Sequence, residues 1–167
     1  MTWKWDRLFA AAAAGALALD LWTKHLVLQH FSLGESLPLL PGLALTYVRN
    51  PGAAFSLLAD AHAGLRVPFF LGVVVVATVA VFWMLRATAS ADWVSRLGLG
   101  LVLGGALGNA FDRVRFGEVV DFIEVGVRTV YVWPIFNAAD SAVCVGVGLL
   151  LWRAFKPLKG DDAPHPL

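Results

Sequence analysis

Apolar residues gather in four long stretches of this chain, at about residues 8–28, 67–85, 94–111 and 135–152. A helix needs roughly 20 mostly apolar residues to cross the core of a bilayer, or about 17 at the short end. The second stretch contains no charged residue, and the third is rich in glycine. This pattern predicts an all-α membrane protein, in which four transmembrane helices form a bundle within a single integral membrane domain over residues 1–155.

Two connecting segments carry the signals of a small sheet. Residues 32–63 contain several prolines and glycines and a strand-like run at residues 43–48, followed by the turn sequence Asn50-Pro51-Gly52. Residues 114–134 contain an alternating stretch at residues 125–133 that favours one more strand. Because four spans put both segments on the same side of the membrane, we expect a small extracytoplasmic β-rich segment on the outer face.

The same four spans place both chain ends on one side of the membrane. Lys and Arg are slightly more numerous on that side, which favours cytoplasmic termini. Residues 156–167 hold proline, glycine and aspartate, and they are predicted to be a disordered cytoplasmic tail. Lys4 and Arg7 before an alanine-rich run also fit a cleaved secretory signal. Three further spans and the polar residues at 20–25 argue against that reading.

The composition excludes several classes of protein. Of the 167 residues, 59% are hydrophobic and 15% are charged, whereas a soluble domain has about 45–50% and about 25%. The formal net charge of +1 offers no basic field for nucleic acid. The single cysteine, Cys144, excludes an internal disulfide framework and a cysteine-based zinc cluster, and the four histidines show no metal-ligand spacing.

Small residues recur at four-residue spacing in three of the apolar stretches. In lipid, helices associate through close approach of their backbones, which small side chains permit. We therefore expect three rows to form the helix contacts of a tight bundle. These rows are Gly100, Gly104 and Gly108; Ala138, Ala142 and Gly146; and Ala10, Ala14 and Ala18.

Ionisable residues within membrane segments are costly, by about 2.5–3.5 kcal/mol each on insertion scales, and they are functional candidates by default. In this chain they converge at one depth, where the helices meet the outer segments. Four clusters make up this group: Asp20 with Lys24; Asn109 with Asp112 and Arg113; Asn137 with Asp140 and Ser141; and Asp121.

Each cluster has a structural reading beside a chemical one. Asp20 and Lys24 share a helix face and form an ion pair, and Asp112 with Arg113 forms a second pair that anchors its helix end. Asp121 and Asp140 stand among apolar residues with no cation within four residues in sequence. Burial should raise the pKa of such carboxyls. If the two face each other, they can share one proton, as in an aspartic protease.

Two other classes of protein fit parts of this pattern. A proton-coupled transporter also places carboxylates within its spans, although usually near the midplane and in two related halves, and this chain shows no repeat. A non-catalytic membrane assembly factor would use the same small-residue faces. It would have no need of two unpaired carboxylates beside water-accessible loops.

Five strings along the chain resemble those of the bacterial lipoprotein signal peptidases, also called signal peptidase II or prolipoprotein signal peptidase. They occur in the order Asp20-Leu-Trp-Thr-Lys24, Asn50-Pro-Gly-Ala-Ala-Phe55, Gly104-Gly-Ala-Leu-Gly-Asn-Ala-Phe-Asp-Arg113, Val119-Val-Asp-Phe-Ile123 and Phe136-Asn-Ala-Ala-Asp-Ser141. The resemblance covers about residues 20–152, and the length and four-span layout also match.

The resemblance implies an aspartyl endopeptidase, a hydrolase of the bacterial cytoplasmic (inner) membrane. Such an enzyme is multi-pass and has its active site near the outer, periplasmic face. It removes signal peptides from diacylglyceryl-modified prolipoproteins and cleaves just before the lipidated cysteine by means of aspartate-activated water. The partners that the resemblance implies are these substrates and membrane lipids. The family uses no metal and no organic cofactor, and nothing requires more than a monomer.

The motifs also imply which residues carry the chemistry. The catalytic pair is Asp121, from the Val119–Ile123 string, and Asp140, from the Phe136–Ser141 string. The residues that support the site or hold substrate are Asn50, Asn109, Arg113, Asn137, Asp20 and Lys24.

Overall fold

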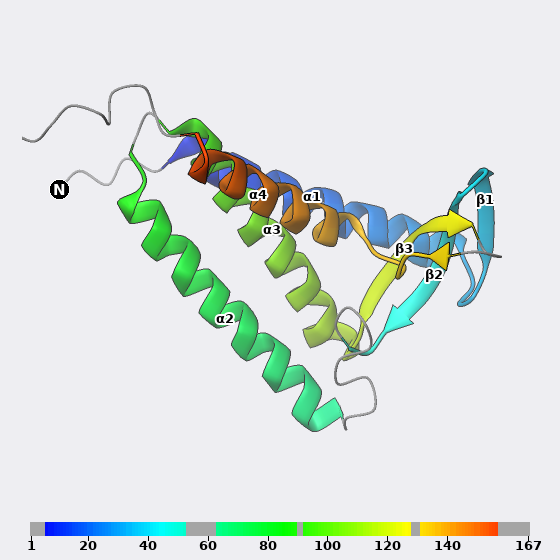
Figure 1. The fold of residues 1–167 in the computed structure, drawn as a ribbon. Coiled ribbons are helices and arrows are strands. Elements are labelled where there is room, and N and C mark those ends of the chain that lie inside the picture. The colour runs from blue at the N-terminus through cyan, green and yellow to red at the C-terminus, as the bar shows by residue number, and fades with distance from the viewer. Residues whose placement is uncertain (1–5, 53–62, 90–91, 128–130, 157–167) are drawn as a thin grey trace, which may run out of the picture.

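Four helices and four strands follow one another along residues 6–52, 63–89, 92–127 and 131–156, which the computed structural model describes (Figure 1). The helices form a bundle, and the strands form a sheet at one end of it. The helices are α1 (Arg7–His30), α2 (Ala63–Ala87), α3 (Trp93–Phe116) and α4 (Ala138–Ala154). The strands are β1 (Ser36–Leu40), β2 (Leu43–Asn50), β3 (Val119–Val127) and β4 (Tyr131–Val132).

The predicted helices are confirmed, and two of them have the character of membrane spans. Among the described residues, Gly64–Ala87 and Trp93–Phe116 are long and apolar enough to cross a bilayer. Helix α1 carries two buried ionisable residues, and α4 has only 17 residues because it begins after its cap at Asn137. Membrane crossing by all four helices therefore stays a prediction. Apart from Lys156, the predicted tail lies outside the described residues.

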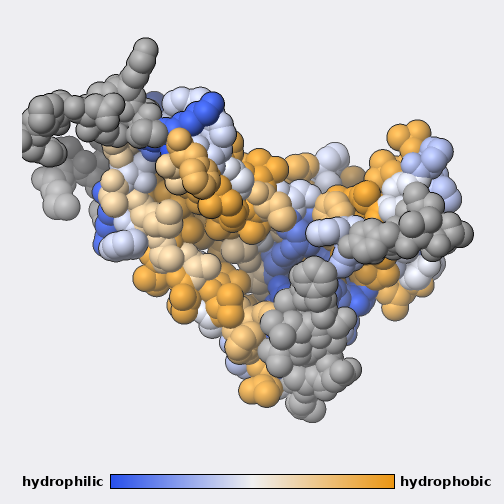
Figure 2. Space-filling model, viewed as in Figure 1, coloured by the Kyte–Doolittle hydropathy of each residue, from blue (hydrophilic) through white to orange (hydrophobic). Residues whose placement is uncertain are grey.

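Helix α3 lies at the centre of the bundle. It packs along both α1 and α4, which touch each other much less. Helix α2 packs mainly on α3, with Phe82 also against Phe9 of α1, and it diverges from α1 and α4 (Figure 1). Figure 2 shows hydrophobic residues over most of the helices and hydrophilic residues gathered where the helices meet the sheet.

Carboxylates cap the helix ends that lie far from the sheet. Asp6 accepts from the Phe9 amide at the start of α1, and Asp92 accepts from the Ser95 amide at the start of α3. Each cap also forms an ion pair with another helix, Asp6 with Arg96 of α3 and Asp92 with Arg153 of α4. These contacts satisfy free backbone N–H groups and hold the three helix ends together.

The glycines of α3 allow its neighbours to approach closely. A Cβ atom at Gly100 would lie 2.6 Å from the carbonyl oxygen of Phe9 on α1, and one at Gly98 would lie 2.9 Å from that of Gly146 on α4. Gly104 faces α1 and Gly105 faces α4 in the same way. The predicted contact row on α3 is therefore confirmed.

The row predicted on α1 is wrong. Ala10, Ala14 and Ala18 are exposed, whereas the atoms closest to the α3 glycines belong to Ala12, Ala13 and Ala16. Alanine stands on every side of this helix, so small size alone does not select a face. The buried positions Ala16, Asp20 and Lys24 follow at four-residue spacing, and they show that the polar pair determines which side of α1 turns inward.

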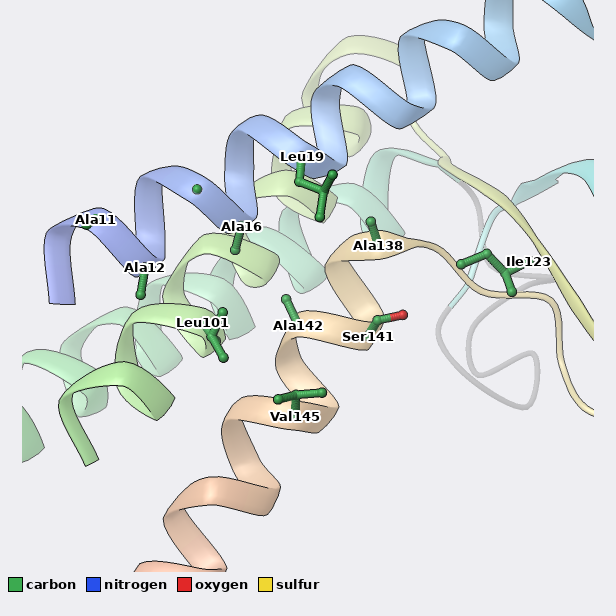
Figure 3. A pocket seen from close by; sticks show the side chains of 11 residues that line it. Ala11, Ala12, Ala16, Leu19, Leu101, Ile123, Ala138, Ser141, Ala142 and Val145 are labelled. Carbon is green, nitrogen blue, oxygen red and sulfur yellow. The ribbon is translucent and has the colours of Figure 1, made fainter. Parts of the chain in front are cut away.

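An apolar groove of about 550 Å³ lies over α3 between α1 and α4 (Figure 3). Gly15 and Ala16 of α1, Leu101 of α3, and Ala142 of α4 line it, among others. Its one hydroxyl, on Ser141, donates to the carbonyl oxygen of Asn137. The groove thus offers an apolar surface and no group for acid–base chemistry.

The sheet is antiparallel, with the strand order β1-β2-β3-β4. The predicted strand at residues 43–48 is confirmed within β2. The turn between β1 and β2 contains Gly42, whose positive φ of 83° favours glycine. The sequence Asn50-Pro51-Gly52 ends β2 and does not form this hairpin turn.

The single strand predicted at residues 125–133 is wrong, because residues 125–127 end β3 and Tyr131–Val132 form β4, which pairs antiparallel with β3. Strand β3 covers Val119–Val127 and pairs Asp121 with Val48 of β2. Val120 is fully buried and, with Phe122, packs against Val27 of α1. Side chains alternate between the two faces of a strand, so Asp121 points away from that apolar cluster.

We predict that Gly104→Ala destabilises the protein by about 1–3 kcal/mol, because the added methyl would overlap the backbone of Ala13 and the Cβ of Ala16. Thermal unfolding of the purified protein in detergent measures the loss. Gly148→Ala on α4 is the matched control, since a Cβ there meets no atom within 4 Å. Equal melting temperatures for the two variants would contradict close packing of α1 on α3.

Candidate active site

Polar side chains from both the helices and the sheet meet where the bundle joins the strands (Figure 2). Hydrogen bonds and ion pairs connect seven of the eight predicted site residues to one another through their side chains, and the eighth, Arg113, donates to the backbone of this group. The seven are Asp20, Lys24, Asn50, Asn109, Asp121, Asn137 and Asp140. Residues far apart in sequence thus form one site.

Asp121 is almost completely buried, with 1% of its surface exposed. Its Oδ1 accepts from the side-chain amide of Asn137 at 2.7 Å, and its Oδ2 accepts from that of Asn50 at 2.9 Å. Both oxygens therefore receive a neutral donor.

Asp140 lies in the first turn of α4. Its Oδ1 accepts from the Asn109 side-chain amide at 2.7 Å, and its Oδ2 accepts from the backbone amide of Asn137 at 3.2 Å. The Asn137 side chain in turn accepts from the Asp140 backbone amide at 2.9 Å, which completes a capping box. Asp140 therefore lies at a helix N-terminus, where backbone N–H groups without partners in the helix point toward its carboxyl.

Two asparagines link the carboxylates. The side-chain amide of Asn137 also donates to the Asn109 carbonyl oxygen at 3.0 Å, so a chain of contacts runs from Asp121 through Asn137 and Asn109 to Asp140. Within the described residues, neither carboxylate forms a salt bridge with Lys or Arg.

Burial, together with the nearby negative charge of Asp140, raises the pKa of Asp121 to about 7. Hydrogen bonds from Asn50 and Asn137 act in the opposite direction, because they stabilise the charged form. Asp121 therefore changes its protonation state near neutral pH, where a general acid or base is most effective.

Lys24 is buried beside this pair with three oxygen partners. Its Nζ lies 2.7 Å from Asp20 Oδ2, 2.9 Å from Asp112 Oδ2 and 3.0 Å from the side-chain carbonyl oxygen of Asn109. The predicted pair of Asp20 and Lys24 is confirmed. The predicted pair of Asp112 and Arg113 is wrong, since consecutive helix residues point about 100° apart and Asp112 faces α1.

Arg113 binds backbone rather than carboxylate. Its guanidinium donates to the carbonyl oxygen of Gly52 at 2.9 Å and to that of Asn109 at 3.3 Å, and it lies 4.4 Å from the ring centroid of Phe70 on α2. It thereby holds the end of β2 against α3 and α2.

The sequence placed Asp112 among the polar residues at the helix ends but assigned it a structural pair with Arg113 rather than a role in the site. Its Oδ2 also accepts from the backbone amide of Val120 at 3.1 Å, and Asp20 Oδ1 accepts from that of Ala139 at 2.9 Å. The signal present in the sequence was the three-residue spacing from Asn109, which puts both side chains on one face of α3. Within the described residues, no three His, Cys, Asp or Glu side chains gather in a way that could hold a metal ion.

Comparison with known proteins assigns the chain to a family. The family described as Signal peptidase (SPase) II matches residues 12–156. The chain belongs to this signal peptidase II family. The resemblance that the five strings indicate is therefore confirmed, and membership makes the chain a protease.

Several relatives of this signal peptidase II chain are called lipoprotein signal peptidase. The relative from Syntrophotalea carbinolica is 48% identical over 151 residues, which cover 88% of this chain and 92% of that protein. The one from Geobacter sulfurreducens is 48% identical, with 86% and 89% covered. The one from Escherichia coli O157:H7 is 42% identical, with 86% of each chain covered.

Two solved structures of a bacterial membrane enzyme share the fold. The first has a TM-score of 0.80 and 29% identity and covers 95% of this chain and 93% of its own. The second has a TM-score of 0.77 and 30% identity, with 89% and 92% covered. The fold of this signal peptidase II chain is therefore that of a membrane enzyme.

We predict that Asn137→Asp lowers the melting temperature more at pH 8 than at pH 5. The new carboxyl keeps an oxygen for the Asp140 amide but presents an oxygen, in place of a donor, to Asp121 Oδ1. At pH 8 two carboxylates repel each other, whereas at pH 5 one of them carries a proton and donates. Thermal unfolding at both pH values measures this.

Asn137→Ser serves as the control, because it retains a capping oxygen and adds no charge. Its loss of stability should change much less with pH. If Asn137→Asp lowers the melting temperature equally at both pH values, residue 137 does not face Asp121.

Proposed function

We propose that this chain is an aspartyl endopeptidase that removes signal peptides from diacylglyceryl-modified prolipoproteins and cleaves just before the lipidated cysteine. The observation that carries the proposal is the shared network of Asp121 and Asp140, in which neutral amides hold two carboxyls near each other. Relatives called lipoprotein signal peptidase support the choice of substrate.

The reaction uses the two carboxyls in different protonation states. Asp140, at the N-terminus of α4, is ionised and removes a proton from water, while protonated Asp121 donates a hydrogen bond to the scissile carbonyl oxygen. Water then attacks the carbonyl carbon to give a tetrahedral intermediate. Asp140 passes the proton that it took from water to the amide nitrogen of the lipidated cysteine, and the carbon–nitrogen bond breaks to leave a free amine and the carboxyl end of the signal peptide. The raised pKa of Asp121 supports this assignment.

The asparagines and Arg113 support the pair. Asn109 and Asn137 orient the carboxyls, and Asn50 steadies Asp121 from the neighbouring strand. Arg113 anchors the backbone just after Asn50 through Gly52. No metal or organic cofactor is part of the mechanism.

The enzyme acts in the bacterial cytoplasmic membrane as a single copy, with four crossing helices, cytoplasmic termini and the site near the outer face. Exposed tryptophans support this placement, since tryptophan gathers at both membrane interfaces. Trp83, Trp93 and Trp152 are exposed near the end of α2, the start of α3 and the end of α4. Trp22 and Trp133 are exposed toward the sheet, in the second half of α1 and just after β4. A site at that edge gives water access to a bond held close to the lipid.

We predict that Asp121→Asn and Asp140→Asn each abolish cleavage of a diacylglyceryl precursor while the protein still folds, because an amide can neither activate water nor supply the acidic proton. Purified variants are incubated with the lipidated precursor, and the two products are read by mass spectrometry. Glu35→Gln is the control, since that carboxylate accepts from the Ser32 backbone amide and, among the described residues, has no contact with the catalytic pair. Retained cleavage in either aspartate variant rejects the pair.

The pH profile gives a separate prediction. If Asp121 acts as the acid, kcat/KM falls by about tenfold per pH unit above a pKa of about 7, because the protonated form is lost. Asn50→Ala removes a donor that stabilises the charged form, so the pKa of Asp121 rises and the decline starts at higher pH. Asn50→Asp adds a negative charge and moves the decline further in the same direction. A decline that stays in place or moves to lower pH is the contrary result.

A further inference from the structure

The two backbone amides that directly precede the proposed catalytic carboxyls are held by two other carboxylates. Asp112 Oδ2 accepts from the amide of Val120, next to Asp121, and Asp20 Oδ1 accepts from the amide of Ala139, next to Asp140. Lys24 lies between them, 2.9 Å from Asp112 and 2.7 Å from Asp20. A continuous path of charged contacts therefore runs from β3 through α3 and α1 to α4.

We propose that Asp20, Lys24 and Asp112 are positioning residues that set the separation and orientation of Asp121 and Asp140. This inference rests on the proposed function, because it assigns the three residues to the same reaction. None of them acts on substrate. Asp112 and Asp20 hold the backbone amides that precede the pair, and Lys24 holds these two carboxylates in place.

Burial explains why the cluster is better suited to positioning than to stability. Asp20, Lys24 and Asp112 are 0%, 2% and 3% exposed, respectively. Removing charges from water is costly, and well-packed apolar residues in place of a buried ion cluster are often as stable or more so. Apolar residues would not supply a hydrogen-bond acceptor for the backbone amides of Val120 and Ala139. These two acceptors fix the positions of the segments that carry Asp121 and Asp140.

The packing around Asp20 has the same consequence. A Cβ atom at Gly108 on α3 would overlap the Asp20 carboxylate, so this carboxylate is confined between α3 and the start of α4. Elsewhere β3 contacts the segment before α4 through the Ile123–Phe136 bridge and the Asn137 side chain. The charged cluster adds a contact on each side of the catalytic pair, and a shift of about 1 Å in such a pair can cost about 100-fold in rate.

The geometry of the two aspartates differs in a way that a mutation can use. Oδ2 of Asp112 meets both Val120 and Lys24, so one amide oxygen in Asp112→Asn can replace both contacts. Asp20 uses Oδ1 for Ala139 and Oδ2 for Lys24, so the single amide oxygen of Asp20→Asn can keep only one of them. Both variants change the charge by the same amount.

The test compares kcat and KM for a diacylglyceryl precursor, per folded protein, in the intact chain. We expect Asp20→Asn and Asp112→Ala to lower kcat by about 100-fold with KM within about threefold, and Asp112→Asn to lower kcat by less than about tenfold. Asp92→Asn, which alters the cap and ion pair at the other end of α3, should lower stability and leave kcat unchanged. If kcat falls equally in Asp20→Asn and Asp112→Asn, the effect comes from the lost charge and the proposal is overturned. If kcat is unchanged in all of these variants, the cluster has a purely structural role, and the proposal is overturned as well.

Hydrogen exchange separates this inference from the proposed function. The Ala139 amide should exchange faster in Asp20→Asn, and the Val120 amide should stay protected in Asp112→Asn but not in Asp112→Ala. Protection that is the same in all variants overturns the inference whether or not the protein cleaves the precursor. If the unaltered protein leaves the precursor intact, the proposed function fails, and exchange at the two amides still decides whether the cluster holds them.

Discussion

The side-chain amide of Asn137 joins a strand to a helix at the point where the chemistry is proposed. It is fully buried, donates to Asp121 at 2.7 Å and caps α4 through the amide of Asp140 at 2.9 Å. An apolar protein has few ways to keep two carboxyls out of water and near each other, because buried charges need partners. Neutral amides meet that need and favour the charged forms less strongly than a cation in contact with the pair would.

The cations of the site are bound elsewhere, which preserves this balance. Lys24 is surrounded by Asp20, Asp112 and the Asn109 carbonyl oxygen, and Arg113 donates to the backbone at Gly52 and Asn109. The carboxyls also lie at one end of the bundle, Asp121 on β3 and Asp140 in the first turn of α4. A proton-coupled transporter would usually hold such groups near the middle of its helices, so the position favours hydrolysis over transport.

The helices could be predicted from sequence because a span must be long and apolar, and the site residues could be predicted because ionisable side chains are scarce in those spans and fall within five motifs. The ion-pair partner of Asp112 could not be predicted. Residue spacing indicates neighbours on the same helix, whereas Lys24 lies on another helix. The face of α1 that packs on α3 could not be predicted from the alanines, because alanine occurs all around this helix. The start of β3 was predicted too far along the sequence, because the apolar run at Val119–Ile123 has no clear period. Only its pairing with β2 identifies this run as part of a strand.

The central claim is that Asp121 and Asp140 act together on one water. A structure of the protein bound to a lipopeptide whose scissile amide is replaced by a hydroxyl-bearing tetrahedral carbon tests it most directly. We expect the hydroxyl oxygen to lie within about 2.5–3.0 Å of an oxygen of each carboxyl, between β3 and the start of α4. A hydroxyl that contacts only one of the two carboxyls, or a peptide bound away from both, would contradict the claim.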